Sequence, residues 1–278
     1  MLLRYTDVFL WTGIFFLLYG YFGVQYKHET RIIGYILLGI FWLNEAPYFI
    51  SLSDHFNAAL CVLALPLFVY FGYHEYLSKK WFEDPEVMKF LAGSVSIAML
   101  IYYIVQRVPV ASGVLIKIVS DHTAYVLQLM GYDYTSGAIN YAGNPLWYRL
   151  NNNELRVPIQ GSGISIILAC TALQTFAPAF SMVYCTTAEK LQKAKVLLIV
   201  LPSLYLANVG RNVLVIYLTV EGITSFDVAH NQIAKTGSVI VLMILLFVAF
   251  EMIPEFHENI MDLLRLPKRE PIHRKQHE

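Results

Sequence analysis

The sequence predicts an all-α polytopic membrane protein with about seven transmembrane helices, an interfacial amphipathic helix and a short extracytoplasmic β-hairpin. Hydrophobic residues make up 57% of the 278 residues, charged residues make up 14%, and the mean hydropathy is +0.53. A single water-soluble core cannot bury so much apolar surface. The 20 basic residues balance the 20 acidic ones, so net charge gives no indication of a nucleic-acid partner.

A transmembrane helix needs about 20 predominantly apolar residues, and runs of about this length predict the spans. The runs are 7–25, 32–50, 57–73, 89–107, 163–184, 196–219 and 227–253. A further apolar stretch, 112–130, is interrupted by several polar residues, which helical spacing gathers mostly on one face. They are Lys117, Ser120, Asp121, His122, Thr123 and Gln128. We therefore expect 112–130 to lie in the membrane interface as an amphipathic helix.

The distribution of basic residues predicts the orientation of the spans. If 112–130 lies flat on the outside, the cytoplasmic segments hold thirteen of the 20 Lys and Arg, whereas only ten are cytoplasmic if it crosses. The thirteen are Lys27, Arg31, Lys79, Lys80, Lys89, Lys190, Lys193, Lys195, Arg265, Lys268, Arg269, Arg274 and Lys275. The positive-inside rule thus favours seven spans, with the N-terminus outside and the C-terminus in the cytoplasm.

On this topology 131–162 is the one long extracytoplasmic loop. Two strand-like runs, 146–150 and 154–159, flank three consecutive asparagines at 151–153. This pattern predicts a β-hairpin with its turn at the asparagines, at the membrane surface. The loop ends at 161–163, where we expect the helix that carries Cys170 to begin.

Three reactive side chains stand out because they lie in or beside apolar runs. Cys170 is expected one to two turns inside the 163–184 span, Arg211 inside the 196–219 span, and His230 near the start of the last span. A rise of 1.5 Å per residue places Cys170 and Arg211 at about the same depth, roughly 10 to 12 Å below the outer surface. Ionisable groups within a membrane indicate a functional site.

The surroundings of these residues resemble the archaeosortase and exosortase family of membrane-embedded cysteine transpeptidases. The resemblance rests on Ala-Cys-Thr at 169–171, Asn-x-x-Arg at 208–211 and Ala-His-Asn at 229–231, in this order along adjacent spans. It extends over roughly 107–255 and includes a proline before the amphipathic helix and Leu-x-x-x-Gly at 127–131. The first hundred residues match only as generic apolar spans.

The resemblance implies an enzyme that cleaves a C-terminal sorting signal, made of a short motif, a transmembrane helix and a basic tail. The new C-terminus of the exported protein is then joined to a membrane lipid. The family's catalytic set carries over onto Cys170, Arg211 and His230. The chain would then be one integral membrane domain over 1–278, with generic N-terminal spans (1–107), a catalytic half (108–255) and a cytoplasmic basic tail (256–278), in the cell membrane of an archaeon.

The chemistry of the three side chains fits this activity. Cationic neighbours favour the nucleophilic thiolate form of Cys170. Arg211 is always charged and has five donors, which suits an oxyanion, and His230 titrates near neutrality, which suits proton transfer to the leaving amine. As supporting or substrate-binding residues we select four more, Asn208, Asn231, Glu45 and Thr171.

Other interpretations of these residues stay open. Cys170 could be a packing residue, and Arg211 could be a structural ion-pair partner of Glu45. A transporter or channel would use Glu45, Arg211 and His230 as a substrate or proton path, and a receptor or chaperone for C-terminal helices would need no chemistry at all. We expect no cofactor and no metal, because no Cys or His pair has zinc-like spacing and no phosphate-binding glycine loop occurs.

Overall fold

The computed structural model describes residues 5–23, 25–132, 134–141, 144–152 and 164–271. The chain divides into two compact units, each of which we describe by itself. Unit 1 comprises Met1–Leu100, Tyr184–Thr187 and Glu255–Glu278, and unit 2 comprises Ile101–Val183 and Ala188–Pro254. That the two units form one domain stays a prediction.

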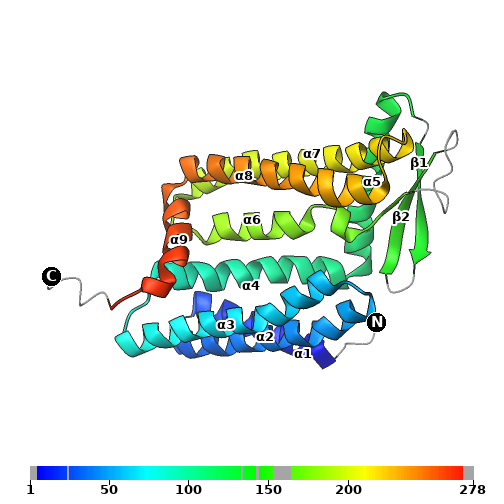
Figure 1. Ribbon diagram of the computed structural model, residues 1–278. Coiled ribbons are helices and arrows are strands. Elements are labelled where there is room, and N and C mark those ends of the chain that lie inside the picture. The colour runs from blue at the N-terminus through cyan, green and yellow to red at the C-terminus, as the bar shows by residue number, and fades with distance from the viewer. Residues whose placement is uncertain (1–4, 24, 133, 142–143, 153–163, 272–278) are drawn as a thin grey trace. The chain divides into compact units, whose positions relative to one another are not determined.

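Unit 1 is built from long helices joined by short turns (Figure 1). They are α1 (Tyr5–Phe22), α2 (Lys27–Ser51), α3 (His55–Trp81) and most of α4 (Glu86–Arg107), followed at the C-terminal end by α9 (Pro254–Arg265) and a 3₁₀ turn, η3 (Leu266–Lys268). Helix α3 begins at Asp54, whose carboxylate accepts a hydrogen bond from the Asn57 amide at 3.1 Å. An aspartate in this position satisfies one of the free amides of a helix start.

Glycines bring α1 and α2 into close contact. A Cβ atom at Gly13 would lie 2.8 Å from a methyl group of Leu38, and one at Gly34 would lie 2.7 Å from Leu17. These distances are below van der Waals contact, so a larger residue at either position would displace the facing leucine. Close approach through small residues is a common way to pack helices in a membrane, where apolar burial gives no driving force.

Unit 2 combines helices with a small sheet (Figure 1). After the end of α4 it contains α5 (Pro109–Leu129), β1 (Tyr134–Tyr141), β2 (Asn144–Asn152), β3 (Ile164–Ile166), a 3₁₀ turn η1 (Leu168–Cys170), α6 (Leu173–Cys185), α7 (Lys190–Val220), a π-helical segment η2 (Val228–Ala234) and α8 (Lys235–Met252). Its core is an apolar cluster that joins α5, β3 and α7, with Ile116, Val119, Leu127, Ile166, Val213 and Ile216 among the buried residues.

Helix α5 occupies the stretch for which the sequence predicts an interfacial helix. It runs across the direction of α7 and α8 in Figure 1, although its length and composition would also allow it to cross a membrane. Contrary to the sequence prediction, the polar residues of α5 do not gather on one exposed face. Lys117 and Asp121 form an exposed ion pair, whereas Ser120 and Thr123 are fully buried on the packed face. The Thr123 hydroxyl donates a hydrogen bond to the Val119 carbonyl of the same helix. This bond reduces the cost of burying the hydroxyl.

The sheet is antiparallel, with β2 between β1 and β3. Its pairing differs from the predicted hairpin. Asn151 and Asn152 do not form a turn, because they continue β2 and lie opposite Thr135 and Tyr134 of β1. The first predicted strand, 146–150, lies within β2, and the second, 154–159, falls outside the described residues. The predicted turn at the asparagines was wrong, because Asn151 and Asn152 pair with residues of β1 and so stay in the extended strand.

The prediction of one helical span over 163–184 was also wrong. Residues 164–166 form β3, which pairs with β2, and the helix α6 begins only at Leu173 and is 13 residues long. Two isoleucines in β3 favour a strand, and Ala172 takes a left-handed conformation with φ 61°, which ends the 3₁₀ turn before α6. Cys170 therefore lies in a turn before α6 and not inside a helix.

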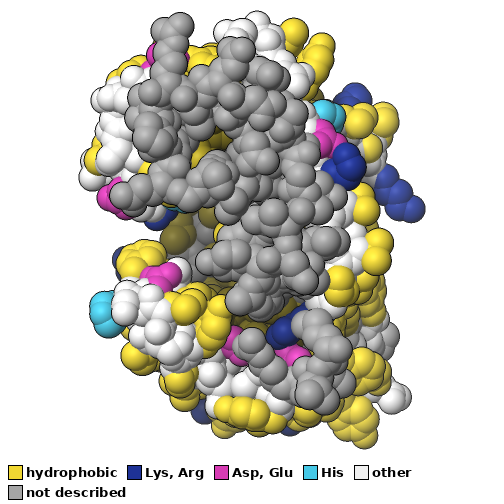
Figure 2. All heavy atoms as spheres, turned by 90° about the vertical axis from the view of Figure 1, so that its right-hand side faces the viewer, with side chains coloured by type: hydrophobic (Ala, Val, Ile, Leu, Met, Phe, Trp, Pro, Cys, Tyr) yellow, Lys and Arg dark blue, Asp and Glu magenta, His cyan; other side chains and the backbone are white. Residues whose placement is uncertain are grey.

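Six helical segments are long and apolar enough to cross a membrane, among the residues that the structure describes. They are α2, α3, α4, α5, α7 and the continuous segment Val228–Met252. Many large apolar side chains are exposed, as on Phe15, Leu63, Leu198 and Phe247, and Figure 2 shows mainly apolar side chains with scattered charges on the described surface of one face. This is a polytopic helical membrane protein. The predicted count of seven spans and their orientation stay predictions.

Candidate functional site

Two asparagines of α7 hold the backbone of Cys170. The side-chain amides of Asn208 and Asn212 donate to the Cys170 carbonyl oxygen at 2.7 and 3.1 Å. Residues four apart lie on the same face of a helix, and a carbonyl oxygen accepts two hydrogen bonds. Both asparagines are buried, so these bonds are protected from competing water. The two hydrogen bonds fix the position of the Cys170 backbone relative to α7.

The chain around Cys170 forms a tight turn that leads into α6. The Cys170 amide donates to the Ile167 carbonyl at 2.8 Å, and the Thr171 hydroxyl donates to the Leu168 carbonyl at 2.7 Å. Thr171 is buried, so its hydroxyl serves the turn. The first bonds of α6 run back to the carbonyl of Ala172. Cys170 thus precedes the N-terminal end of α6, where helix dipoles favour negative charge.

The Cys170 side chain is partly buried and lies outside the six candidate spans. Burial raises the pKa of its thiol, and a backbone hydrogen bond at Ile167 and the positive charge of Arg211 oppose this rise. Desolvation disfavours the thiolate and a nearby cation favours it. The thiol and the guanidinium are therefore close enough to interact electrostatically.

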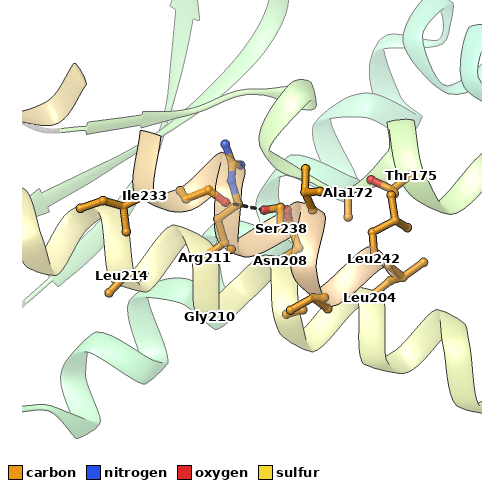
Figure 3. Close-up of a pocket in the computed structure, with 15 residues that line it drawn as sticks. Ala172, Thr175, Leu204, Asn208, Gly210, Arg211, Leu214, Ile233, Ser238 and Leu242 are labelled. Atoms are coloured by element: carbon orange, nitrogen blue, oxygen red, sulfur yellow. Dashed lines mark hydrogen bonds between the residues drawn. The ribbon is translucent and has the colours of Figure 1, made fainter. Parts of the chain in front are cut away.

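Arg211 follows Asn208 by three residues on α7 and is half-buried. It lines a cavity of about 340 Å³ between α7 and α8, which Ala172, just before α6, and Thr175 of α6 also border (Figure 3). Most of the remaining wall is apolar, with leucines at both ends, such as Leu214. The cavity thus places an arginine in apolar surroundings, and it borders Ala172, which lies two residues after Cys170.

His230 lies in the π-helical segment η2, at the start of the last span. Its ring stacks on Phe226 with centroids 5.3 Å apart, and it interacts electrostatically with Arg211. Short π-helical segments are rare and occur often at functional sites. Asn231 is exposed and donates to the Asp227 carboxylate at 2.6 Å, so its amide stabilises the start of this segment.

Unit 2 thus holds six of the seven residues selected from the sequence. Cys170 is linked to Arg211 and to Asn208, Thr171 shapes the cysteine turn, and His230 lies near Arg211. Asn231 lies beside His230 and bonds to Asp227. The sequence reasoning missed Asn212, although its spacing of four from Asn208 was a usable signal.

Glu45 belongs to α2 of unit 1, where its carboxylate accepts a hydrogen bond from Thr6 at 3.3 Å. Arg211 belongs to unit 2. The expected pairing of Glu45 with Arg211 therefore stays a prediction. Thr6 is buried and gives Glu45 a partner that the sequence did not suggest.

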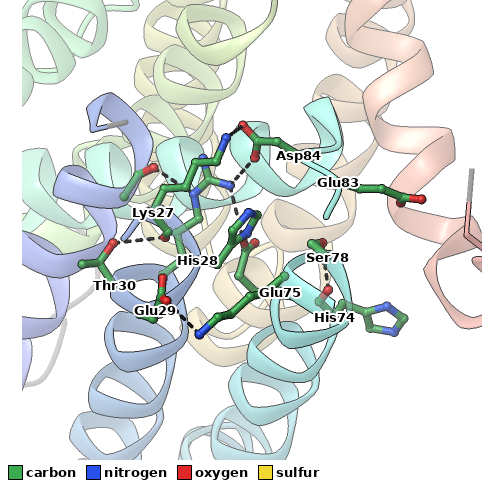
Figure 4. Close-up of polar contacts among 12 residues, drawn as sticks. Lys27, His28, Glu29, Thr30, His74, Glu75, Ser78, Glu83 and Asp84 are labelled. Carbon is green, nitrogen blue, oxygen red and sulfur yellow. Dashed lines mark hydrogen bonds and ion pairs between the residues drawn. The ribbon is translucent and has the colours of Figure 1, made fainter. Parts of the chain in front are cut away.

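A second polar cluster lies in unit 1 and was not predicted (Figure 4). Arg31 is only 1% exposed, and its Nη1 atom lies 3.2 Å from Glu75 and 2.9 Å from Asp84. Its Nε atom donates to the Gly20 carbonyl at 2.9 Å, and His28 lies 2.5 Å from the same Glu75 oxygen. A buried arginine needs such partners, because charge without them is strongly destabilising.

Within the described residues, one group has the composition of a metal site. Ligand atoms of His28, Glu75 and Asp84 lie within 4.8 Å of one another. The guanidinium of Arg31 already faces both carboxylates. A divalent cation among these oxygens would repel that buried positive charge, so we interpret the group as an ion-pair network around Arg31.

Fold and site together define a polytopic membrane protein in which a thiol interacts electrostatically with an arginine that lines a mostly apolar cavity. A profile of the transmembrane exosortase family matches residues 8–250, and the chain belongs to this family. It is 22% identical over 266 residues to an archaeosortase A of Haloferax volcanii, covering 83% of this chain and 82% of the relative.

A second archaeosortase A, from Natronomonas pharaonis, is 21% identical over 291 residues, which cover 94% of this chain and 89% of that protein. No solved structure matches the chain. The family predicted from the short motifs around Cys170, Arg211 and His230 is confirmed, and the match extends into the N-terminal spans that the resemblance left out.

Proposed function

We propose that the protein is an intramembrane cysteine endopeptidase and transpeptidase that processes the C-terminal sorting signals of exported proteins. The observation that carries the proposal is the link between Cys170 and α7. Asn208 and Asn212 hold the Cys170 carbonyl, and Arg211 of the same helix acts on the thiol. Family membership supports a membrane-embedded enzyme that acts on exported proteins.

The proposed reaction starts from the Cys170 thiolate and a protonated His230. The thiolate attacks the scissile carbonyl carbon, and Arg211 stabilises the oxyanion that forms. The peptide C–N bond breaks, the leaving amine of the helix-bearing fragment takes the proton from His230, and a thioester to Cys170 remains. Binding to α7 through two buried asparagines would keep the sulfur in place throughout these steps.

The thioester is then transferred to an acceptor. The amine of a membrane lipid attacks the thioester carbon and gives one proton to His230, which yields an amide and releases the Cys170 thiolate. If water attacks in place of the lipid, the same proton transfer yields a carboxylic acid. Either outcome returns Cys170 and His230 to their starting states. The reaction needs no metal or cofactor.

The test is processing of a reporter in a host that lacks the enzyme. An exported protein would carry a C-terminal short motif, an apolar helix of about 20 residues and a Lys/Arg tail, taken from the same genome. We expect the parent enzyme to remove the helix and change the reporter's mass, and Cys170→Ala to leave it intact. Cys61→Ala is the matched control, because Cys61 is also a free thiol in an apolar environment. Full processing by Cys170→Ala would overturn the proposal.

A further inference from the structure

The cavity beside Arg211 extends along α7 and α8 well beyond the arginine. Its wall includes Leu204 and Leu214, which lie ten residues apart on α7, a distance of about 15 Å along the helix axis. Gly210 lies between them on α7 (Figure 3). Gly237 of α8 also lines the cavity. The cavity is therefore long and mostly apolar, and it borders Ala172, two residues after Cys170.

Nothing in the described fold requires glycine at position 210 or 237. Both lie inside helices, and a Cβ atom at either position would meet nothing within 4 Å. The positive-φ glycines among the described residues are Gly131 and Gly222, so the backbone does not require glycine at 210 or 237. A glycine inside a helix is destabilising relative to alanine, because it loses more backbone freedom on folding. The open space that they leave is thus the feature to explain.

The polar groups in the wall favour a peptide over an alkyl chain as the occupant. Thr175, Asn208 and Ser238 place hydroxyl and carboxamide groups in a wall that is otherwise mostly apolar. The Ser238 hydroxyl donates to the carbonyl of Ala234, the last residue of η2, so its oxygen can still accept a hydrogen bond. The first four amides of any helix lack partners in that helix. The free amides at the start of a substrate helix can donate hydrogen bonds to such oxygens, whereas an alkyl chain has no hydrogen-bond donor.

We propose that this cavity binds the first turns of the substrate's transmembrane helix, with bulky apolar side chains entering the space beside Gly210 and Gly237. The inference rests on the proposed function and specifies where the helix that follows the scissile bond is recognised. Arg211 and Ala172 border the same cavity, and Ala172 lies two residues after Cys170, so a chain that leaves the helix there is near the cysteine turn. Gly237 is then a residue that determines specificity.

The test makes the cavity smaller by a substitution in the enzyme, and then compensates by making the side chains of the substrate helix smaller. Gly237→Leu fills the cavity from α8 and leaves Arg211 and Cys170 themselves unchanged. Gly237→Ala adds a single methyl group at the same position. Ile240→Phe adds bulk to an exposed position of α8 that does not line the cavity. The probes are two forms of the processing reporter, one with Leu or Phe in the first two helical turns and one with Ala at those positions.

We expect Gly237→Leu to lower processing of the bulky reporter on the order of 10- to 200-fold, the range for a few methylenes in an apolar pocket, and to process the alanine reporter nearly normally. Ile240→Phe should resemble the parent, and Gly237→Ala should give a smaller loss with the bulky reporter than Gly237→Leu. Equal loss with both reporters, or no loss, would overturn the inference while leaving the proposed function intact. So would normal cleavage with loss of lipid attachment alone, because the cavity would then hold the acceptor lipid.

Discussion

The Asn208 side chain donates a hydrogen bond to the backbone carbonyl of Cys170 at 2.7 Å, across 38 residues of sequence. The bond joins a turn that precedes α6 to the middle of α7, the helix that also carries Arg211. A thiol on a turn would otherwise share the freedom of its loop. The position of Cys170 relative to Arg211 thus depends on an asparagine that does no chemistry itself.

This dependence predicts a positioning role for both asparagines. Asn208→Ala removes the shorter bond, and we expect processing to fall by as much as about 100-fold, because small displacements of a nucleophile are costly. Asn212→Ala removes the longer bond and should cost less. The stability of each variant should fall by only about 1 kcal/mol. The measurement is reporter processing beside thermal unfolding in detergent.

A double variant separates positioning from simple loss of fold. If both amides act on the same carbonyl, the two substitutions together should cost less activity than the product of the single effects. Asn231→Ala is the control, because that amide bonds to Asp227 in η2. Activity that tracks unfolding in every variant would argue against a positioning role.

The charge of Arg211 predicts a pH effect on the Cys170 thiol. Arg211 opposes the rise of the Cys170 pKa that burial causes, so Arg211→Gln should raise this pKa further. Less thiolate is then present at a given pH, and alkylation at neutral pH should be several-fold slower. The measurement is the pH profile of iodoacetamide labelling in a variant with Cys61→Ala and Cys185→Ala. An unchanged profile would show that Arg211 does not act on the thiol.

The geometry of the guanidinium predicts that charge alone is insufficient. Arg211→Lys keeps the positive charge but loses the planar arrangement of donors that fits an oxyanion. We expect a loss of processing on the order of 10²- to 10³-fold, comparable to removing an oxyanion donor elsewhere. Cys170→Ser should be inactive as well. A transporter that uses Glu45, Arg211 and His230 would tolerate Cys170→Ser, so retained function in that variant would favour the transporter interpretation.

The sequence predicted the long helices well, because apolar runs of span length have few other structures available in a membrane. The runs 32–50 and 196–219 lie inside α2 and α7, which continue past them into charged residues such as Lys27 and Lys190. The same rule failed at 163–184. An apolar run with β-branched residues suits a strand as well as a helix, and only the pairing of β3 with β2 decides between them.

The candidate site was partly predictable for a similar reason. Cys170, Arg211 and His230 attract notice because each is costly in apolar surroundings. The hydrogen bonds from Asn208 and Asn212 to the Cys170 carbonyl could not be predicted from residue types, because they depend on the position of a turn that is distant in the sequence. Likewise, the Glu75 and Asp84 contacts of Arg31 join α2 to later segments that no local pattern connects.

The last prediction concerns orientation. The lysines at 190, 193 and 195 and the basic C-terminal tail should both lie in the cytoplasm, because cytoplasmic loops are enriched in Lys and Arg. A reporter fused after Lys275 should therefore be cytoplasmic, and a reporter inserted near Asn152 should be outside. Phosphatase and fluorescent-protein fusions measure the two sides independently. With α5 lying flat, 134–152 and the C-terminus are on opposite sides; reporters on the same side would overturn the seven-span topology and the interfacial placement of α5.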